Sequence, residues 1–103
     1  MNLFSIQGIA KDLLTQYGSP LYVYHAPTIL KQIKDIKDAI KYQDFQLAYS
    51  CKANTNLKIL SIMKQNGIAL DTVSPGEIFL ALKAGYSPSQ IMYTANCSTD
   101  DDL

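Results

Sequence analysis

The sequence predicts an α/β fold built on a small parallel sheet. Three short apolar stretches have the β-branched and aromatic composition of strands, and they begin near Phe45, Ala69 and Ile91. They recur at intervals of 24 residues (Phe45 to Ala69) and 22 residues (Ala69 to Ile91), with a helical pattern between them. Parallel strands need such a crossover helix. The carboxyl ends of the strands then meet at one edge of the sheet, where we expect any chemistry.

The N-terminal segment predicts one helix and one strand ahead of this repeat. Apolar residues at helical spacing predict an amphipathic helix over residues 3–17, and Gly18 follows as its stop. A serine and a proline then break the chain. Residues 21–24 (LYVY) are aromatic and β-branched, which predicts a strand.

The next segment carries the clearest helical pattern of the chain. Pro27 suits a first helical turn, and four isoleucines then form one stripe of a helix that ends near Tyr42. The stripe consists of Ile29, Ile33, Ile36 and Ile40. Residues 45–51 (FQLAYSC) predict the first strand of the repeat, which delivers Lys52 to its carboxyl end.

Capping signals define the two helices of the repeat. Asn56 can cap a helix that stops at Gly67, and residues 68–73 (IALDTV) predict the second strand after it. Residues 74–77 (SPGE) have the serine, proline and glutamate of a capped helix start. Gly85 ends that helix.

The C-terminal segment predicts a third strand and the beginning of another helix. Residues 91–94 (IMYT) predict the strand, and the acidic run over residues 100–102 suits a helix N-terminus. Three βα units do not close a barrel, which takes about 250 residues. We therefore expect this chain to be a piece of a longer protein.

The composition argues against several classes of function. The formal net charge is zero and every basic residue is a lysine, so the chain has neither a basic patch for nucleic acid nor an arginine fork for a phosphate. Two cysteines and one histidine fit no disulfide framework and no metal cluster, so we expect no metal. The N-terminus has the pattern of neither a signal peptide nor a membrane span, which favours the cytoplasm.

Lys52 is the sharpest candidate for chemistry. It follows an apolar strand at the mouth of the predicted sheet, where a partly buried amine can form a Schiff base. The local sequence alone favours the plainer alternative, a lysine that ends a strand and points into water.

Neighbouring residues offer further candidates, each with a structural alternative. Asp71 lies in an apolar strand, so its carboxylate needs a partner, either in a site or among the backbone amides of the next turn. Glu77 and the serine three residues before it fit a capping box, which explains both. Ser50 shares the parity of Lys52 and should line the same interior, whereas Cys51 should point toward the helices as a small core residue.

Three motifs resemble those of a known enzyme family. Residues 49–56 (YSCKANTN) resemble the Y-x-x-K-A-N-x-N signature of diaminopimelate decarboxylases, which belong to the alanine-racemase-like pyridoxal-phosphate decarboxylases. Residues 18–24 (GSPLYVY) are similar to their G-T-P-L-Y-V-Y, and residues 71–77 (DTVSPGE) to their D-V-V-S-G-G-E. The motifs occur in the family's order and spacing, and the resemblance extends over residues 6–103. Ala95 stands where the family often has glycine.

The resemblance implies a cofactor, a reaction and a set of site residues. It implies a partial (β/α)8 TIM barrel of the alanine racemase/ornithine decarboxylase type that binds pyridoxal 5'-phosphate. Lys52 would form the internal aldimine with the cofactor, and Ser50, Asp71 and Glu77 would lie near it. The implied reaction converts the amino acid meso-diaminopimelate to L-lysine and CO₂, in a full-length protein that is a homodimer.

The resemblance also implies a domain division and leaves alternatives open. Residues 1–25 would contribute to a second, β-rich domain, and residues 26–103 would form the first βα units of the truncated pyridoxal-phosphate-binding barrel. A related ornithine, lysine or arginine decarboxylase, or an amino-acid racemase of the same fold, stays an alternative, because the residues that distinguish them lie outside this stretch. A non-enzymatic small α/β cofactor-binding domain is a third possibility. We expect the 103-residue chain to be inactive by itself, because the phosphate cradle of such a barrel is built late in the chain.

Overall fold

The computed structural model describes residues 3–96 and 98–102 of the 103-residue chain. The chain divides into two compact units, Met1–Ala39 and Ile40–Leu103. This division falls after the second helix, whereas the sequence suggests a boundary at residue 25. The boundary at residue 25 concerns the domains of a longer protein and stays a prediction.

The first unit holds two helices, α1 (Leu3–Tyr17) and α2 (Ala26–Ala39), as the apolar spacing predicts, although α2 ends before the predicted end near Tyr42. Gly18 ends α1 with a φ of 80° and donates its N–H to the Leu14 carbonyl at 2.9 Å. The prediction of a strand over residues 21–24 is wrong for this chain, because these four exposed residues belong to no sheet. A strand needs a neighbour for its backbone hydrogen bonds, and the described residues supply none there.

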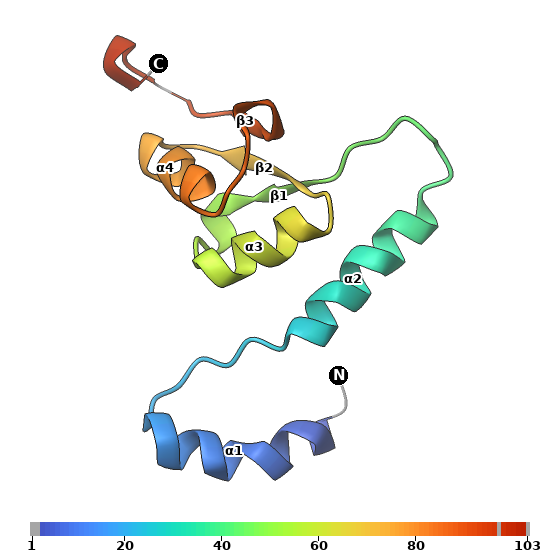
Figure 1. The fold of residues 1–103 in the computed structure, drawn as a ribbon, viewed down its shortest axis with the longest axis vertical. Coiled ribbons are helices and arrows are strands. Elements are labelled where there is room, and N and C mark those ends of the chain that lie inside the picture. Colours follow the sequence, from blue (N-terminus) through green and yellow to red (C-terminus); the bar gives the residue numbers. More distant parts are fainter. Residues whose placement is uncertain (1–2, 97, 103) are drawn as a thin grey trace. The chain divides into compact units, whose positions relative to one another are not determined.

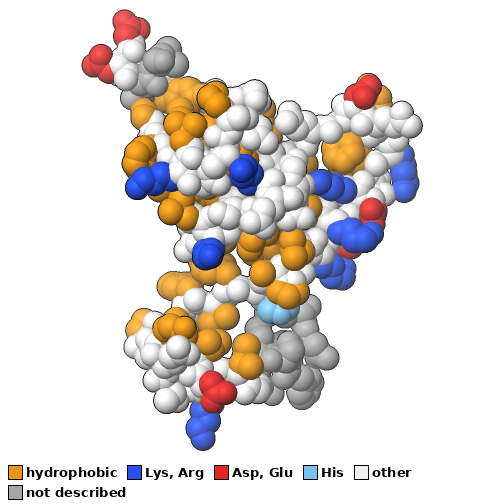
Figure 2. Space-filling view, viewed as in Figure 1, with side chains coloured by type: hydrophobic (Ala, Val, Ile, Leu, Met, Phe, Trp, Pro, Cys, Tyr) orange, Lys and Arg blue, Asp and Glu red, His pale blue; other side chains and the backbone are white. Residues whose placement is uncertain are grey.

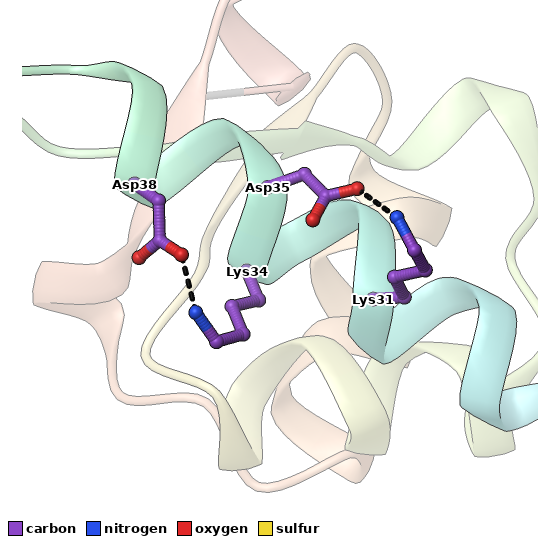
Figure 3. Close-up of polar contacts among 4 residues, drawn as sticks. All are labelled: Lys31, Lys34, Asp35 and Asp38. Atoms are coloured by element: carbon purple, nitrogen blue, oxygen red, sulfur yellow. Dashed lines mark hydrogen bonds and ion pairs between the residues drawn. The ribbon is translucent and has the colours of Figure 1, made fainter.

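Two ion pairs lie on the exposed surface of α2, as Figure 3 shows. Lys31 pairs with Asp35 and Lys34 pairs with Asp38, each across one helical turn. The hydrogen bond to Asp38, together with the charge of that carboxylate, raises the pKa of Lys34. Water and salt screen such exposed pairs, so they contribute little to stability and indicate a solvated helix face.

The second unit confirms the predicted repeat of strands and helices (Figure 1). Strands β1 (Ala48–Ser50), β2 (Ala69–Thr72) and β3 (Ile91–Tyr93) form a parallel sheet in the order β1-β2-β3. Helices α3 (Leu57–Gln65) and α4 (Pro75–Lys83) connect successive strands. Each crossover helix lets the next strand run in the same direction as the last, which places the three carboxyl ends at one edge.

A buried cluster holds the sheet against its helices. Leu60 of α3, Ala81 of α4 and Leu70 of β2 meet in this cluster with Cys51 and Tyr86. Burying a leucine side chain stabilises a fold by about 2 kcal/mol. Successive side chains of a strand point to opposite faces of the sheet. The strand residues next to the core residues therefore point to the face that this cluster does not cover.

The predicted helix caps are present in the second unit. The Asn56 side chain accepts the Lys58 N–H at 2.9 Å, and the Ser74 hydroxyl accepts the Glu77 N–H at 3.2 Å. Each bond satisfies one of the N–H groups that a helix leaves free at its start. The helix expected at the acidic run is a single 3₁₀ turn, Asp100–Asp102.

Large hydrophobic side chains are exposed on both units, and Figure 2 shows such side chains among the charged ones on the visible face. Tyr22 is 87% exposed and Phe79 is 57% exposed.

None of the described helices has the length and apolar character that crossing a bilayer requires.

Candidate functional site

The candidate site lies at the carboxyl edge of the sheet. In the parallel register, Ser50 of β1 pairs with Asp71 of β2, and Asp71 pairs with Met92 of β3. Residues paired in this way project to the same face of the sheet. The core residue Leu70 precedes Asp71 in the strand and therefore projects to the opposite face. Lys52 follows Ser50 by two residues, in the turn that begins directly after β1.

A short 3₁₀ turn, Cys51–Ala53, carries Lys52. The Asn54 N–H closes this turn by donating to the Cys51 carbonyl at 3.1 Å. The Tyr49 hydroxyl donates to the Asn54 carbonyl at 3.2 Å, which ties the end of the turn to β1. These two hydrogen bonds therefore fix the turn that carries Lys52 relative to β1.

The Lys52 side chain is exposed. The partly buried position expected of a Schiff-base lysine is not found in the chain as it stands, whereas the alternative of a lysine that ends a strand and points into water agrees with this exposure. Three strands form an open sheet, whereas an enclosed mouth requires strands on all sides. The position directly after β1, at the mouth of a parallel sheet, is the predicted one.

A hydroxyl–carboxylate cluster of Ser50, Asp71 and Thr94 lies at the same edge. The Thr94 hydroxyl donates to Oδ1 of Asp71 at 2.5 Å, and the Ser50 hydroxyl donates to Oδ2 at 3.3 Å. The partly buried carboxylate thus has a hydroxyl donor for each oxygen, which is what a carboxylate in a strand requires. The alternative in which Asp71 binds the backbone amides of the next turn is not what the structure shows.

Thr94 is the member of this cluster that the sequence analysis did not single out. Its N–H donates to the Thr72 carbonyl at 2.9 Å, which continues the β2–β3 ladder one residue past β3. Thr94 stands two residues after Met92, the partner of Asp71, so it has the matching parity. The pairing register between β2 and β3 identifies Thr94, whereas the pattern along a single strand does not.

Glu77 has a backbone role in the structure. Its carboxylate accepts the Val73 N–H at 2.7 Å, while its own N–H donates to the Ser74 hydroxyl. Only half of the predicted capping box is formed, because the Glu77 carboxylate binds the N–H of Val73, the residue before the cap, and not that of Ser74. This bond holds the carboxylate beside the end of β2, and a place near a cofactor stays a prediction.

Cys51 is a buried core residue, as predicted. Its side chain has no exposed area and packs in the central cluster. Burial raises the pKa of the Cys51 thiol, and the negative charges of Glu77 and Asp71 raise it further. A neutral, enclosed thiol is a poor nucleophile, which leaves the amine of Lys52 as the candidate nucleophile at this edge.

Comparison with known proteins places these residues in a family context. The model of the "Pyridoxal-dependent decarboxylase, pyridoxal binding domain" family matches residues 26–103. A diaminopimelate decarboxylase of Methanothermobacter thermautotrophicus is 44% identical over 96 residues, which cover 91% of this chain and 22% of that protein. The chain therefore spans about a quarter or less of the length of such relatives.

Solved structures of related enzymes share the fold. The diaminopimelate decarboxylase of Helicobacter pylori, complexed with L-lysine, superposes with a TM-score of 0.83 at 32% identity, over 90% of this chain and 24% of that one. An ornithine decarboxylase of Entamoeba histolytica gives a TM-score of 0.77 at 19% identity, over 87% of this chain and 29% of that one. The second comparison concerns the fold alone, which is that of a partial barrel of this enzyme type.

Proposed function

We propose a function from the premise that this chain belongs to the pyridoxal-dependent decarboxylase family, whose pyridoxal-binding domain it matches over residues 26–103. The full-length protein decarboxylates meso-diaminopimelate to L-lysine and CO₂, with pyridoxal 5'-phosphate held by Lys52. The observation that carries this proposal is the lysine in YSCKANTN (residues 49–56), directly after the first strand of the parallel sheet. The 44% identity to a named diaminopimelate decarboxylase supports the substrate.

The residues at the carboxyl edge fit pyridoxal phosphate. Its aldehyde condenses with a primary amine, and the exposed Lys52 amine is open to such a group. Asp71, with its two hydroxyl donors, supplies a fixed negative charge at the same edge. The chain contains no arginine, so an arginine contact to the cofactor phosphate would come from the rest of the full-length protein.

The chemistry divides between the cofactor and the side chains. When bound, pyridoxal phosphate supplies an electron sink for the electron pair that remains when CO₂ departs. The Lys52 amine would hold the cofactor, and its Nζ could carry a proton for the reaction. Ser50, Asp71 and Glu77 would bind the cofactor beside that amine.

The oligomeric state, the location, the pathway and the class of substrate belong to the same proposal. The full-length protein is a homodimer and acts in the cytoplasm, as an enzyme of lysine biosynthesis. Its substrate is a small amino acid, which the L-lysine complex of the Helicobacter pylori relative supports. Neither nucleic acid nor a membrane is among the proposed partners.

Replacing Lys52 tests the proposed role directly. In the full-length protein, Lys52→Ala should abolish CO₂ release from meso-diaminopimelate and remove the visible absorbance of lysine-bound cofactor, because no other amine takes its position. Lys58→Ala is the matched control: this exposed lysine lies in α3, and its loss should change neither signal.

The same assay separates the proposed reaction from its relatives. Ornithine, lysine and arginine are offered beside meso-diaminopimelate, and CO₂ release is compared. A preference for one of the three would refute the proposed substrate while leaving the reaction class intact. Full activity of Lys52→Ala would refute the assignment of the lysine.

A further inference from the structure

The carboxylate of Asp71 connects the ends of all three strands. Asp71 lies in the central strand β2, Ser50 lies in β1, and Thr94 directly follows β3. Both neighbouring hydroxyls donate to the carboxylate, one to each oxygen. The two bonds differ in length, at 2.5 Å from Thr94 and 3.3 Å from Ser50. The Thr94 hydroxyl is the nearer of the two donors, and a hydrogen bond to a charged acceptor is stronger than one between neutral groups.

Thr94 is well placed to hold that orientation. Its backbone N–H is bound to the Thr72 carbonyl at 2.9 Å, so its backbone is fixed to β2, the strand that carries Asp71. Its β-branched side chain also restricts rotation about χ1. The donor therefore has little freedom to follow a carboxylate that turns away.

We propose that Thr94 is a positioning residue, whose hydroxyl holds the Asp71 carboxylate at the strand edge that carries Lys52. This inference rests on the proposed function, because orientation matters only if a reaction takes place there. A fixed carboxylate stabilises the charges of the reaction without having to reorganise during it, whereas a freely turning one does not. Thr94 itself contacts Asp71 and acts through it.

The test compares two substitutions of Thr94 in the full-length protein. Thr94→Val keeps the volume and removes the hydroxyl, while Thr94→Ser keeps the hydroxyl and removes a methyl group. Thr15→Val is the matched control, because the Thr15 hydroxyl binds a backbone carbonyl on exposed α1, that of Lys11, at 2.8 Å. The measurements are kcat and KM for meso-diaminopimelate, and the Asp71 side-chain orientation in crystal structures of the cofactor-free variants.

The proposal predicts a specific pattern. Thr94→Val should rotate Asp71 and lower kcat about tenfold with KM changed less than about twofold, because a misplaced group slows the reaction. Thr94→Ser should restore the orientation and recover most of the lost kcat, and Thr15→Val should match the wild type. An unmoved Asp71 in Thr94→Val, an unchanged kcat, or equal losses in both Thr94 variants would each overturn the proposal.

The structural readout separates this inference from the proposed function. A wild-type protein that neither binds pyridoxal phosphate nor releases CO₂ would overturn the proposed function, and with it any role of Thr94 in that reaction. The cofactor-free crystal structures would still decide whether Thr94 orients Asp71. Rotation of Asp71 in Thr94→Val with normal catalysis would overturn the positioning role alone.

Discussion

At the scale of single residues, Tyr86 joins the parts of the second unit. It is 4% exposed and lies in the buried cluster with Leu60 and Leu70. Its hydroxyl lies 3.3 Å from the Leu60 carbonyl and 3.1 Å from the Ile68 carbonyl, and it donates to both. Burial raises the pKa of Tyr86 to about 12, with a smaller contribution from the neighbouring Cys51. The phenol therefore stays protonated in the folded protein at pH values where an exposed tyrosine ionises.

This pKa predicts a loss of stability at high pH. Between the ordinary pKa of 10.0 and about 12, the unfolded chain ionises Tyr86 while the folded protein keeps the proton, so stability falls as pH rises. The loss is about 2 kcal/mol by the top of this range. Tyr86→Phe should remove this pH dependence and lower the free energy of unfolding by about 1 kcal/mol at neutral pH, through the lost hydrogen bond.

Urea unfolding of the full-length protein at neutral and high pH measures both effects. Tyr22→Phe is the matched control, because Tyr22 is 87% exposed and should show neither effect. The same decline above the ordinary tyrosine pKa in wild type and Tyr86→Phe would contradict the assignment.

The sequence predicted some of the site residues and not others, for a physical reason. Parity along one strand sufficed to place Cys51 in the core and Ser50 on the opposite face of the strand. Thr94 escaped because its partner lies in another strand, and pairing between strands depends on register. Whether the Lys52 side chain is enclosed depends on how many strands surround the carboxyl end of the sheet. The sequence around Lys52 does not determine that number.

At the scale of elements, glycines at the helix ends determine where the helices stop. Gly85 follows α4 with a φ of 88°, in the left-handed region that glycine adopts readily. Gly85→Ala should lower the free energy of unfolding by about 1–2 kcal/mol, because a side chain is disfavoured in that conformation. The added Cβ would lie 3.1 Å from the end of the flexible Lys64 side chain, which can move aside.

A glycine inside a helix provides the opposite control. Gly8 lies within α1, and a Cβ added there meets nothing within 4 Å. Gly8→Ala should therefore raise the free energy of unfolding by about 0.5–1 kcal/mol, because alanine loses less backbone entropy in a helix. Chemical denaturation of both variants of the full-length protein measures the two changes. Equal signs for the two substitutions would contradict the role of the backbone conformation at Gly85.

The elements themselves differ in how far the sequence determines them. Helix α1 was predicted over its whole length, because periodic apolar residues and a glycine stop act within the segment. Strand β1 is shorter than predicted, and its last expected residue lies in the turn Cys51–Ala53. Residues 21–24 have strand composition but form no strand, since strand formation depends on a partner elsewhere in the chain.

At the scale of the whole molecule, apolar surface is left without a cover. An open apolar pocket of about 230 Å³ lies between α4 and β3. It is lined by Ile78, Leu82, Pro88, Ile91 and Tyr93. Strands β1 and β3 each have one neighbour in the sheet, so each has an open edge. Exposed edges and apolar patches of this kind promote association between chains.

These features predict how residues 1–103 behave when expressed by themselves. We expect poor solubility or partial folding, because residues 21–24 expose aromatic and aliphatic side chains and the sheet edges stay open. Hydrogen exchange should find its strongest protection around Leu60 and Leu70 in the buried cluster, and little protection in residues 21–24. Binding of a hydrophobic dye per chain should exceed that of the full-length protein, in which we expect further elements to cover the same surfaces. A soluble monomer with a sharp cooperative melt and little dye binding would show that the described core suffices for folding, and would contradict this prediction.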